Sequence, residues 1–238
     1  MTHDFAWSAL PAKGISEHAY GPERVAEALR ESISAGGILP GTKLPEVRLT
    51  QQLEVSRHTL RSAFQILAGE GLVERRPNRG VFVHSPTPED IREIYRVRRI
   101  LETGAVRAAE FSPEAVEALR GIVAGARRAK EAGDVDGMGE ANQQLHRTLI
   151  AQARSTTLET LMEQVLARMR LVFHTKRGEH TFHHEYVERN GELVEMLAAG
   201  ERQRAEEYLL DYLNAAEREL LEHLAGPARP WSSAPDRM

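Results

Sequence analysis

The sequence contains no cysteine, few aromatic residues (5%) and no long apolar run among its 238 residues. The lack of cysteine excludes disulfides, thiolate metal sites and thiol nucleophiles. A membrane-spanning helix needs about 20 apolar residues, and the N-terminus lacks the charged start and apolar core of a secretory signal. We therefore expect a cytoplasmic protein that does not have a membrane as its partner.

The net charge is only −4, so the chain is not basic throughout. The segment 48–79 nevertheless holds six arginines and three glutamates, a balance of +3 that leaves −7 for the rest of the chain. A basic module joined to an acidic one is typical of a DNA-binding domain followed by a regulatory domain. The length is that of one or two domains.

The first part of the chain reads as an extended arm followed by a small domain over 17–84. The expected elements are an arm over 1–16, a helix over 22–35, a turn over 38–44 and a short helix over 46–53. Proline suits the first turn of the first helix, and two glycines end it. In the short helix we expect Val47 and Leu49 to face inward.

The stretch that follows Ser56 predicts the second helix of a helix-turn-helix. Ser56 is a good N-cap because its hydroxyl can accept from free backbone N–H groups of the first turn. The apolar residues recur at helical spacing and form one face, at Leu60, Ala63, Phe64 and Leu67. Polar donors in the first turns of such a helix suit the major groove of DNA. The alternative is an ordinary amphipathic surface helix.

Two short strands, 72–76 and 81–83, flank the turn residues 77–80. They predict a hairpin with a basic tip, which can reach phosphates or a minor groove beside the helix. A solvated hairpin is the alternative for this piece taken alone. Helix, turn, helix and basic hairpin in this order predict a winged helix-turn-helix.

Residues 20–84 resemble the winged-helix domain of the GntR family of bacterial transcription regulators. The residues that carry the resemblance are Leu39-Pro-Gly41, Leu44, Glu46, Leu49, Leu53, Val55-Ser-Arg57, Leu60-Arg61, Ala63, Leu67, Gly71-Leu-Val-Glu74 and Arg79-Gly80. The resemblance implies double-stranded operator DNA as a partner. The DNA-binding residues that we expect are Arg48, Ser56, Arg57, His58, Thr59, Arg61, Asn78, Arg79 and Gly80.

A proline-containing linker over 85–90 separates this domain from a helical one over 91–226, which is followed by a tail over 227–238. Proline disfavours helix at the residue before it, and Thr87 can cap the helix that begins near Pro88. The apolar spacing predicts six helices, over 88–110, 112–133, 134–153, 156–174, 182–199 and 201–224. Helices of this number and length can enclose a core.

The helical part resembles the FCD domain of the FadR-like subgroup of the same family. The matching segments are Val97–Glu102, Leu145–Leu149 and Leu193–Glu201. The fold class implied for the whole chain is mostly α, an N-terminal winged helix-turn-helix plus a C-terminal all-helical FCD bundle. By resemblance, this bundle binds an effector and dimerises.

Most members of the subgroup hold a divalent metal through one Asp and three His. The corresponding positions here are Asn142, His146, Asn190 and Tyr212, so one of four matches. Amides and a neutral phenol, whose pKa is about 10, are poor replacements for these ligands. We therefore expect no metal and no other cofactor, and a polar effector pocket formed by these four side chains.

Arg98 is the fifth candidate for the effector pocket. In the subgroup an arginine at this position can face the cavity, where it would pair with a carboxylate in bidentate fashion. The alternative is an ion pair with Glu102, one helical turn further along. The sequence leaves both open.

These features predict a DNA-binding transcription regulator that is not an enzyme. It would bind a palindromic operator as a homodimer and respond to a small-molecule effector, an organic acid or related metabolite by resemblance. One alternative is a constitutive repressor with a vestigial pocket. Another is an enzyme that uses His146 as general base, which is disfavoured because the sequence offers no acidic partner and no nucleophile motif.

Overall fold

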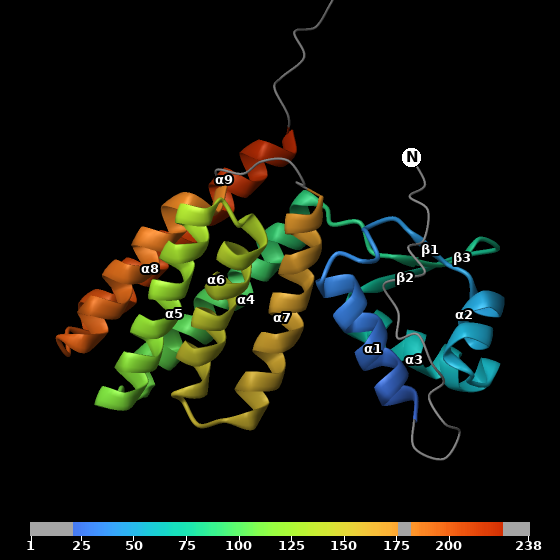
Figure 1. Cartoon of the computed structure of the whole chain (residues 1–238), viewed down its shortest axis with the longest axis horizontal. Coiled ribbons are helices and arrows are strands. Elements are labelled where there is room, and N and C mark those ends of the chain that lie inside the picture. Colours follow the sequence, from blue (N-terminus) through green and yellow to red (C-terminus); the bar gives the residue numbers. More distant parts are fainter. Residues whose placement is uncertain (1–20, 176–181, 226–238) are drawn as a thin grey trace, which may run out of the picture.

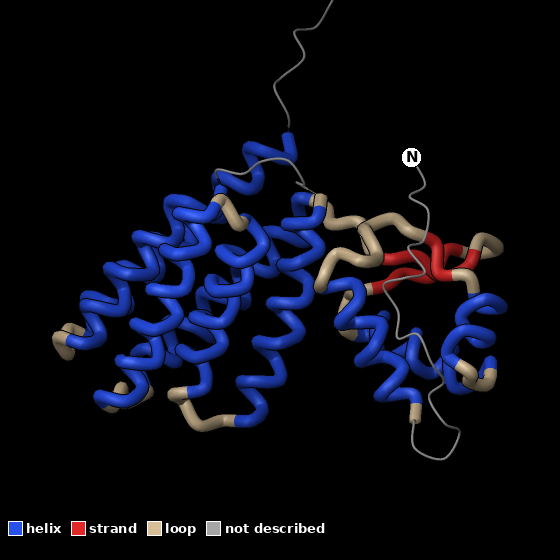
Figure 2. Tube along the Cα trace, viewed as in Figure 1, coloured by secondary structure: helices blue, strands red, loops and turns tan. Residues whose placement is uncertain are grey.

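The computed structural model describes residues 21–175 and 182–225, which form a small winged domain beside a helical bundle (Figures 1 and 2). The predicted arm over 1–16 and the predicted tail over 227–238 lie outside the described residues, as do residues 176–181. The chain is mostly helical, with one small sheet in the winged domain. The predicted fold class is therefore confirmed.

The winged domain consists of three helices and three strands. These are α1 (Pro22–Ser34), β1 (Lys43–Leu44), α2 (Glu46–Leu53), α3 (Arg57–Gly69), β2 (Val73–Arg76) and β3 (Gly80–Val83). The antiparallel sheet has the strand order β1-β3-β2. We expected only a turn over 38–44, and the short β1 is a correction. Two residues are too few to show an alternation, and only their pairing with Phe82 and Val81 of β3 makes them a strand.

The tight turn between α2 and α3 is formed by Glu54, whose φ of 54° is left-handed, and by the cap residue Ser56. The expectation that Val47 faces inward is wrong, because its side chain is exposed. The buried positions of α2 are Leu49 and Leu53, one turn apart. Val47 is two residues before Leu49, about 200° around the helix, and so lies on the opposite face.

The helical domain contains six helices among the described residues. These are α4 (Pro88–Ala108), α5 (Pro113–Ala132), α6 (Val135–Ala151), α7 (Thr156–His174), α8 (Phe182–Ala198) and α9 (Arg202–Ala225). Local capping sets several of the boundaries. Thr87 and Asp90 form a capping box at α4, and Asp134 accepts from the backbone N–H of Gly137 at the start of α6. Because α4 begins at Pro88, its first turn includes the last three residues assigned to the linker.

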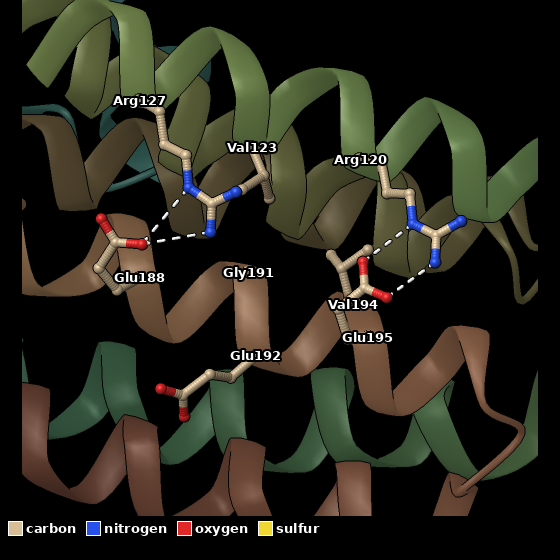
Figure 3. A pocket seen from close by; sticks show the side chains of 8 residues that line it. All are labelled: Arg120, Val123, Arg127, Glu188, Gly191, Glu192, Val194 and Glu195. Atoms are coloured by element: carbon tan, nitrogen blue, oxygen red, sulfur yellow. Dashed lines mark hydrogen bonds and ion pairs between the residues drawn. The ribbon is translucent and has the colours of Figure 1, made fainter. Parts of the chain in front are cut away.

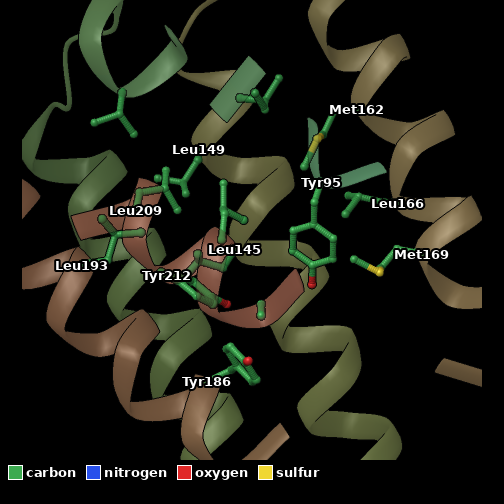
Figure 4. Close-up of a cluster of buried hydrophobic side chains, with 14 of the residues drawn as sticks. Tyr95, Leu145, Leu149, Met162, Leu166, Met169, Tyr186, Leu193, Leu209 and Tyr212 are labelled. Carbon is green, nitrogen blue, oxygen red and sulfur yellow. The ribbon is translucent and has the colours of Figure 1, made fainter. Parts of the chain in front are cut away.

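The apolar faces of the six helices form one core, part of which is shown in Figure 4. Ile100 of α4, although apolar, does not join this core and is exposed. Within the described ranges, none of the helices is both long enough and apolar enough to cross a bilayer.

Helix α7 of the bundle also contacts the winged domain, and Figure 1 shows it next to α1. Its residues Ala167 and Leu171 are buried in the core of the winged domain rather than in that of the bundle. At its end, the Nε2 atom of His174 lies 2.7 Å from the carbonyl oxygen of Ser34, near the end of α1. The winged domain is thus packed against one helix of the bundle.

A polar network also crosses the boundary between the domains. The His84 ring lies between Glu74 of β2, at 3.3 Å, and Asp90 of α4, at 3.0 Å. Asp90 also contacts Arg168 of α7, at 3.4 Å. Burial by itself would raise the pKa of Asp90, but hydrogen bonds from Thr87 and His84 outweigh it and lower the pKa to about 2. Asp90 is therefore a carboxylate at neutral pH, held between wing strand and bundle.

Candidate DNA-binding face and effector site

The exposed side of α3 carries the polar side chains that the sequence predicted. Arg57, His58 and Arg61 are exposed. The apolar residues on the opposite face of the helix are buried in the domain core. Ser56 caps the helix, since its Oγ accepts from the backbone N–H of Thr59 at 3.0 Å. Its hydroxyl also lies 2.8 Å from the Thr59 hydroxyl. Ser56 and Thr59 therefore fix the first turn, from which the basic side chains project.

A groove of about 490 Å³ runs between α3 and the wing. Its lining includes four predicted residues, His58, Arg61, Asn78 and Gly80. Asn78 and Gly80 both have positive φ, 59° and 104°, and form the tight turn at the wing tip. The wing and α3 thus line the same groove.

Other predicted residues lie outside this groove. Arg48, Arg57 and Arg79 are exposed but do not line it. Gln65 and Arg75 are among the residues that line it although we did not predict them as DNA contacts. Gln65 could have been found because it lies two turns beyond His58 on the polar face. Arg75 and its neighbour Arg76 both line the groove, so the alternation of the strand could not have identified Arg75.

In the bundle, Arg98, Glu102 and His146 form a buried triad. Arg98 Nε donates to Glu102 Oε1 at 2.7 Å, so the ion pair along α4, one of the two alternatives for Arg98, is present. Arg98 Nη2 lies 2.8 Å from His146 Nε2, and His146 Nδ1 lies 2.6 Å from Glu102 Oε2. A guanidinium only donates, so Nε2 must accept and Nδ1–H must donate to Glu102. The partners therefore fix one neutral tautomer of His146.

The charges in the triad compensate each other. Burial would raise the pKa of Glu102, but the charge of Arg98 and the contact with His146 outweigh it and lower the pKa to about 2. Burial lowers the pKa of His146 below its ordinary value, despite the neighbouring carboxylate. The triad thus holds one cation, one anion and one neutral imidazole at pH 7. Glu102 is the acidic partner of His146 that we missed, because it lies on a different helix.

The three remaining predicted pocket residues meet beside the triad. Asn142 Oδ1 accepts from Asn190 Nδ2 at 2.8 Å and from the Tyr212 hydroxyl at 3.1 Å. These side chains come from α6, α8 and α9, and the Tyr212 ring lies 5.9 Å from the His146 ring, centroid to centroid. Figure 4 shows Tyr212 and Tyr186 in the interior of the bundle. The four positions carried over from the metal site are therefore neighbours in space.

One acceptor of this cluster remains unsatisfied. Asn190 Oδ1 is buried and has no hydrogen-bond partner in the described part of the chain. A buried polar atom without a partner costs about 1–3 kcal/mol, so this oxygen favours a water or a ligand that donates to it.

The donor set does not fit a transition-metal ion. Apart from one imidazole, it consists of two amides and a phenol whose pKa is raised by burial. The Nε2 lone pair of His146, which an ion would need, is directed at the Arg98 guanidinium. Among residues 21–175 and 182–225, no group of three or more His, Cys, Asp or Glu side chains has an arrangement that could hold an ion.

A separate cavity of about 530 Å³ lies outside the cluster, between α5 and α8 (Figure 3). Two ion pairs cross it, Arg120 with Glu195 and Arg127 with Glu188. None of the five predicted effector residues lines this cavity. Gly191, which does line it, follows Asn190 directly in the sequence.

The comparisons with known proteins give a family match for the winged domain and another for the helical domain. Residues 22–83 match "Bacterial regulatory proteins, gntR family", and residues 93–215 match "FCD domain". The chain belongs to the GntR family of transcription regulators, in the group with an FCD domain. It is a DNA-binding transcription regulator and not an enzyme. His146 accordingly is no general base, and its ring nitrogens already face Arg98 and Glu102.

Individual relatives support the assignment. A putative GntR transcriptional regulator from Rhodococcus sp. RHA1 has a solved structure that is 38% identical, with a TM-score of 0.76, over 84% of this chain and 97% of that one. An HTH-type regulator from Agrobacterium vitis, from the TAR-I ttuE-ttuC' intergenic region, is 32% identical over 53% of this chain and 77% of its own length. The gluconate operon repressor of Bacillus subtilis is 42% identical, but over only 39% of this chain and 37% of its own.

Proposed function

We propose that this regulator binds a palindromic operator as a homodimer and responds to an organic acid or related metabolite bound in the bundle without a metal. The observation that carries the effector site is the cluster of Asn142, Asn190 and Tyr212 beside the buried triad, with one acceptor unsatisfied. Operator DNA lies in the cytoplasm, and the protein would act there. The alternative of a constitutive repressor makes a different prediction in the experiment below.

The triad sets a condition on an acidic effector. The Arg98 guanidinium is 3% exposed and is already compensated by Glu102. A carboxylate must therefore share Arg98 with Glu102 or displace Glu102 from it. Either event changes the charge balance around His146. A ligand shifts a conformational equilibrium only if its affinities for the two states differ. This rearrangement would supply that difference in affinity.

The experiment is a thermal-shift screen of the full chain against monocarboxylic, dicarboxylic, hydroxy and sugar acids. We expect at least one acid to raise the melting temperature, because a ligand that binds only the folded state stabilises it. EDTA should leave the shift unchanged. In Tyr212→Phe the loss of one hydrogen bond should weaken binding of that acid about threefold to tenfold, with unchanged DNA affinity.

Tyr208→Phe is the matched control. Tyr208 lies on the same helix as Tyr212, but its hydroxyl donates to Glu192 on the outside of the bundle, at 2.8 Å. This variant should bind the acid like the wild type. A screen without any stabilising acid would support the constitutive repressor. A shift abolished by EDTA would overturn the metal-free site, and equal effects of the two variants would show that the site lies elsewhere.

The homodimer is supported by apolar side chains exposed on two neighbouring helices. Ile100 of α4 is 68% exposed and Leu161 of α7 is 43% exposed, and α4 packs against α7. A twofold interface brings the same patch of both subunits together. We infer that this face covers the face of a second copy, which would place two winged domains at the two half-sites of a palindrome.

Sedimentation at micromolar concentration tests the dimer. The wild type should have twice the chain mass of 26.6 kDa. Ile100→Glu should be mainly monomeric, because the interface would have to bury charged groups near their own copies. Leu210→Glu is the control, since Leu210 is 40% exposed on α9 and should leave the dimer intact. A monomeric wild type, or a dimeric Ile100→Glu variant, would contradict this interface.

A further inference from the structure

One histidine at the boundary between the two domains lies between two carboxylates. The Nδ1 atom of His84 lies 3.3 Å from Glu74 Oε2 on β2, and its Nε2 atom lies 3.0 Å from Asp90 Oδ2 on α4. His84 directly follows β3, and its backbone N–H donates to the carbonyl oxygen of Leu72 at 2.9 Å. Its backbone therefore belongs to the winged domain, while its side chain connects the wing with the first turn of the bundle.

Both neighbours of the ring are carboxylates near neutral pH. The pKa of Asp90 is lowered to about 2. Burial alone would raise the pKa of Glu74, but hydrogen bonds from Arg76 and His84 outweigh it and lower the pKa. A carboxylate only accepts hydrogen bonds, whereas a neutral imidazole has one donor and one acceptor. The ring can therefore donate to both carboxylates only as an imidazolium, and loss of one proton leaves a ring lone pair facing a carboxylate.

The other polar contacts at this boundary do not need that proton. Arg168 of α7 lies 3.4 Å from Asp90 Oδ1 and packs against the turn after α3, where a Cβ on Gly71 would come within 3.2 Å of Arg168 Nε. A guanidinium stays charged in proteins. The Nε2–H of His174 donates to the carbonyl oxygen of Ser34, which a neutral ring can do equally well. Loss of the imidazolium proton would therefore loosen the boundary without separating the domains.

We propose that His84 is a proton-controlled latch that fixes the winged domain on the bundle when its ring is protonated and lets the winged domain move when the ring is neutral. Histidine is the side chain that ordinarily titrates between pH 5 and 8. Operator binding would require fixed positions of both winged domains of a dimer, so the latch would make operator affinity depend on protons. That consequence rests on the proposed function, whereas the latch itself lies within one chain.

Because the sequence has no cysteine, the latch can be tested with site-specific spin labels. Gln51→Cys in α2 and Ala118→Cys in α5, both at exposed positions, carry the labels in the full chain. Pulsed electron resonance without DNA or effector measures the distribution of the distance between them, and an excess of unlabelled chain suppresses distances between two copies. We expect one narrow peak at pH 5.5. At pH 8.5 the fraction of molecules outside this peak should rise about twofold to fivefold, the effect of one partly exposed ion pair.

Two variants distinguish the latch from a contact that is only structural. In His84→Gln the side chain cannot gain a proton, so the broad distribution should occur at both pH values. In Glu74→Gln the amide nitrogen can donate to the unprotonated ring nitrogen while the ring donates to Asp90, so the narrow peak should persist at pH 8.5. Both variants should thus lose the response to pH, with distributions of opposite width.

His174→Gln is the matched control, because it removes another histidine at the same boundary and should keep the wild-type response. Melting curves at both pH values would show that all variants are folded. The proposal is overturned if the wild-type distribution is the same at both pH values or broadens on acidification, or if His84→Gln responds like the wild type. A response lost in His174→Gln would also overturn it. Absence of operator binding would reject the proposed function and leave these distances unaffected.

Discussion

Replacing Arg57 and Arg61 together by alanine should weaken operator binding by about 100-fold, because an arginine that contacts DNA is worth about 1–3 kcal/mol. Both side chains are exposed on the first two turns of α3, so the fold should tolerate their loss. The dependence of affinity on salt should also flatten, by about one unit of slope for each phosphate that is no longer neutralised. Anisotropy titrations at several salt concentrations measure both effects.

Arg204→Ala is the matched control for this experiment. Arg204 is an exposed arginine paired with a glutamate, Glu201, in the way that Arg61 is paired with Glu46. The substitution removes a positive charge from the helical domain, at a position far along the chain from the groove. We expect wild-type affinity and an unchanged salt slope. Wild-type isotherms for the double variant of α3 would show that this helix is not the DNA-reading element.

Replacing Glu102 by glutamine should lower the free energy of unfolding by about 3–5 kcal/mol, the usual cost of leaving a buried charge without its partner. Arg98 is 3% exposed and Glu102 is fully buried, so solvent cannot compensate the arginine. Glutamine keeps the shape of the side chain, which limits the change to charge and hydrogen bonding. Chemical denaturation at pH 7 measures the loss.

The pH dependence gives a second readout of the same triad. Folding lowers the pKa of Glu102 from 4.5 to about 2. The stabilisation is therefore complete above pH 4.5 and is lost as the pH falls through this window. The lowered pKa of His146 acts in the same direction, with losses that begin near pH 6.5. The acid limb below pH 4.5 should be shallower in Glu102→Gln than in the wild type.

Glu201→Gln is the control for this stability experiment. Glu201 is 43% exposed in its pair with Arg204, and exposed pairs contribute at most about 1 kcal/mol. If Glu102→Gln were as stable as this control, the triad would not be the closed ion-pair network that its distances indicate.

The local elements of the fold could be predicted because their causes are local. Ser56, Ser112 and Asp134 cap the helices that follow them, since a side chain that accepts from the first turn needs no distant partner. β1 and the orientation of Val47 could not be predicted in this way. The first depends on β3, almost forty residues further along, and the second on a helix too short to define its inner face by pattern.

Only part of the candidate effector site could be predicted from the sequence, for the same reason. The spacing of Asn142 and His146 places both on one face of α6, and resemblance supplied Asn190 and Tyr212. The link from Glu102 to His146 spans 44 positions in the sequence. No periodicity connects residues so far apart, so only the packing of α4 against α6 reveals the acidic partner.

The sequence by itself determined the two-domain order, the helices and their caps, and the basic character of the front domain, because spacing, capping and charge act over a few residues. The tertiary structure decided which polar groups are neighbours. It placed His84 between Glu74 and Asp90 across the domain boundary, and it buried Leu171 of α7 in the core of the winged domain. These contacts depend on how whole elements pack, and that packing is not encoded at any single position.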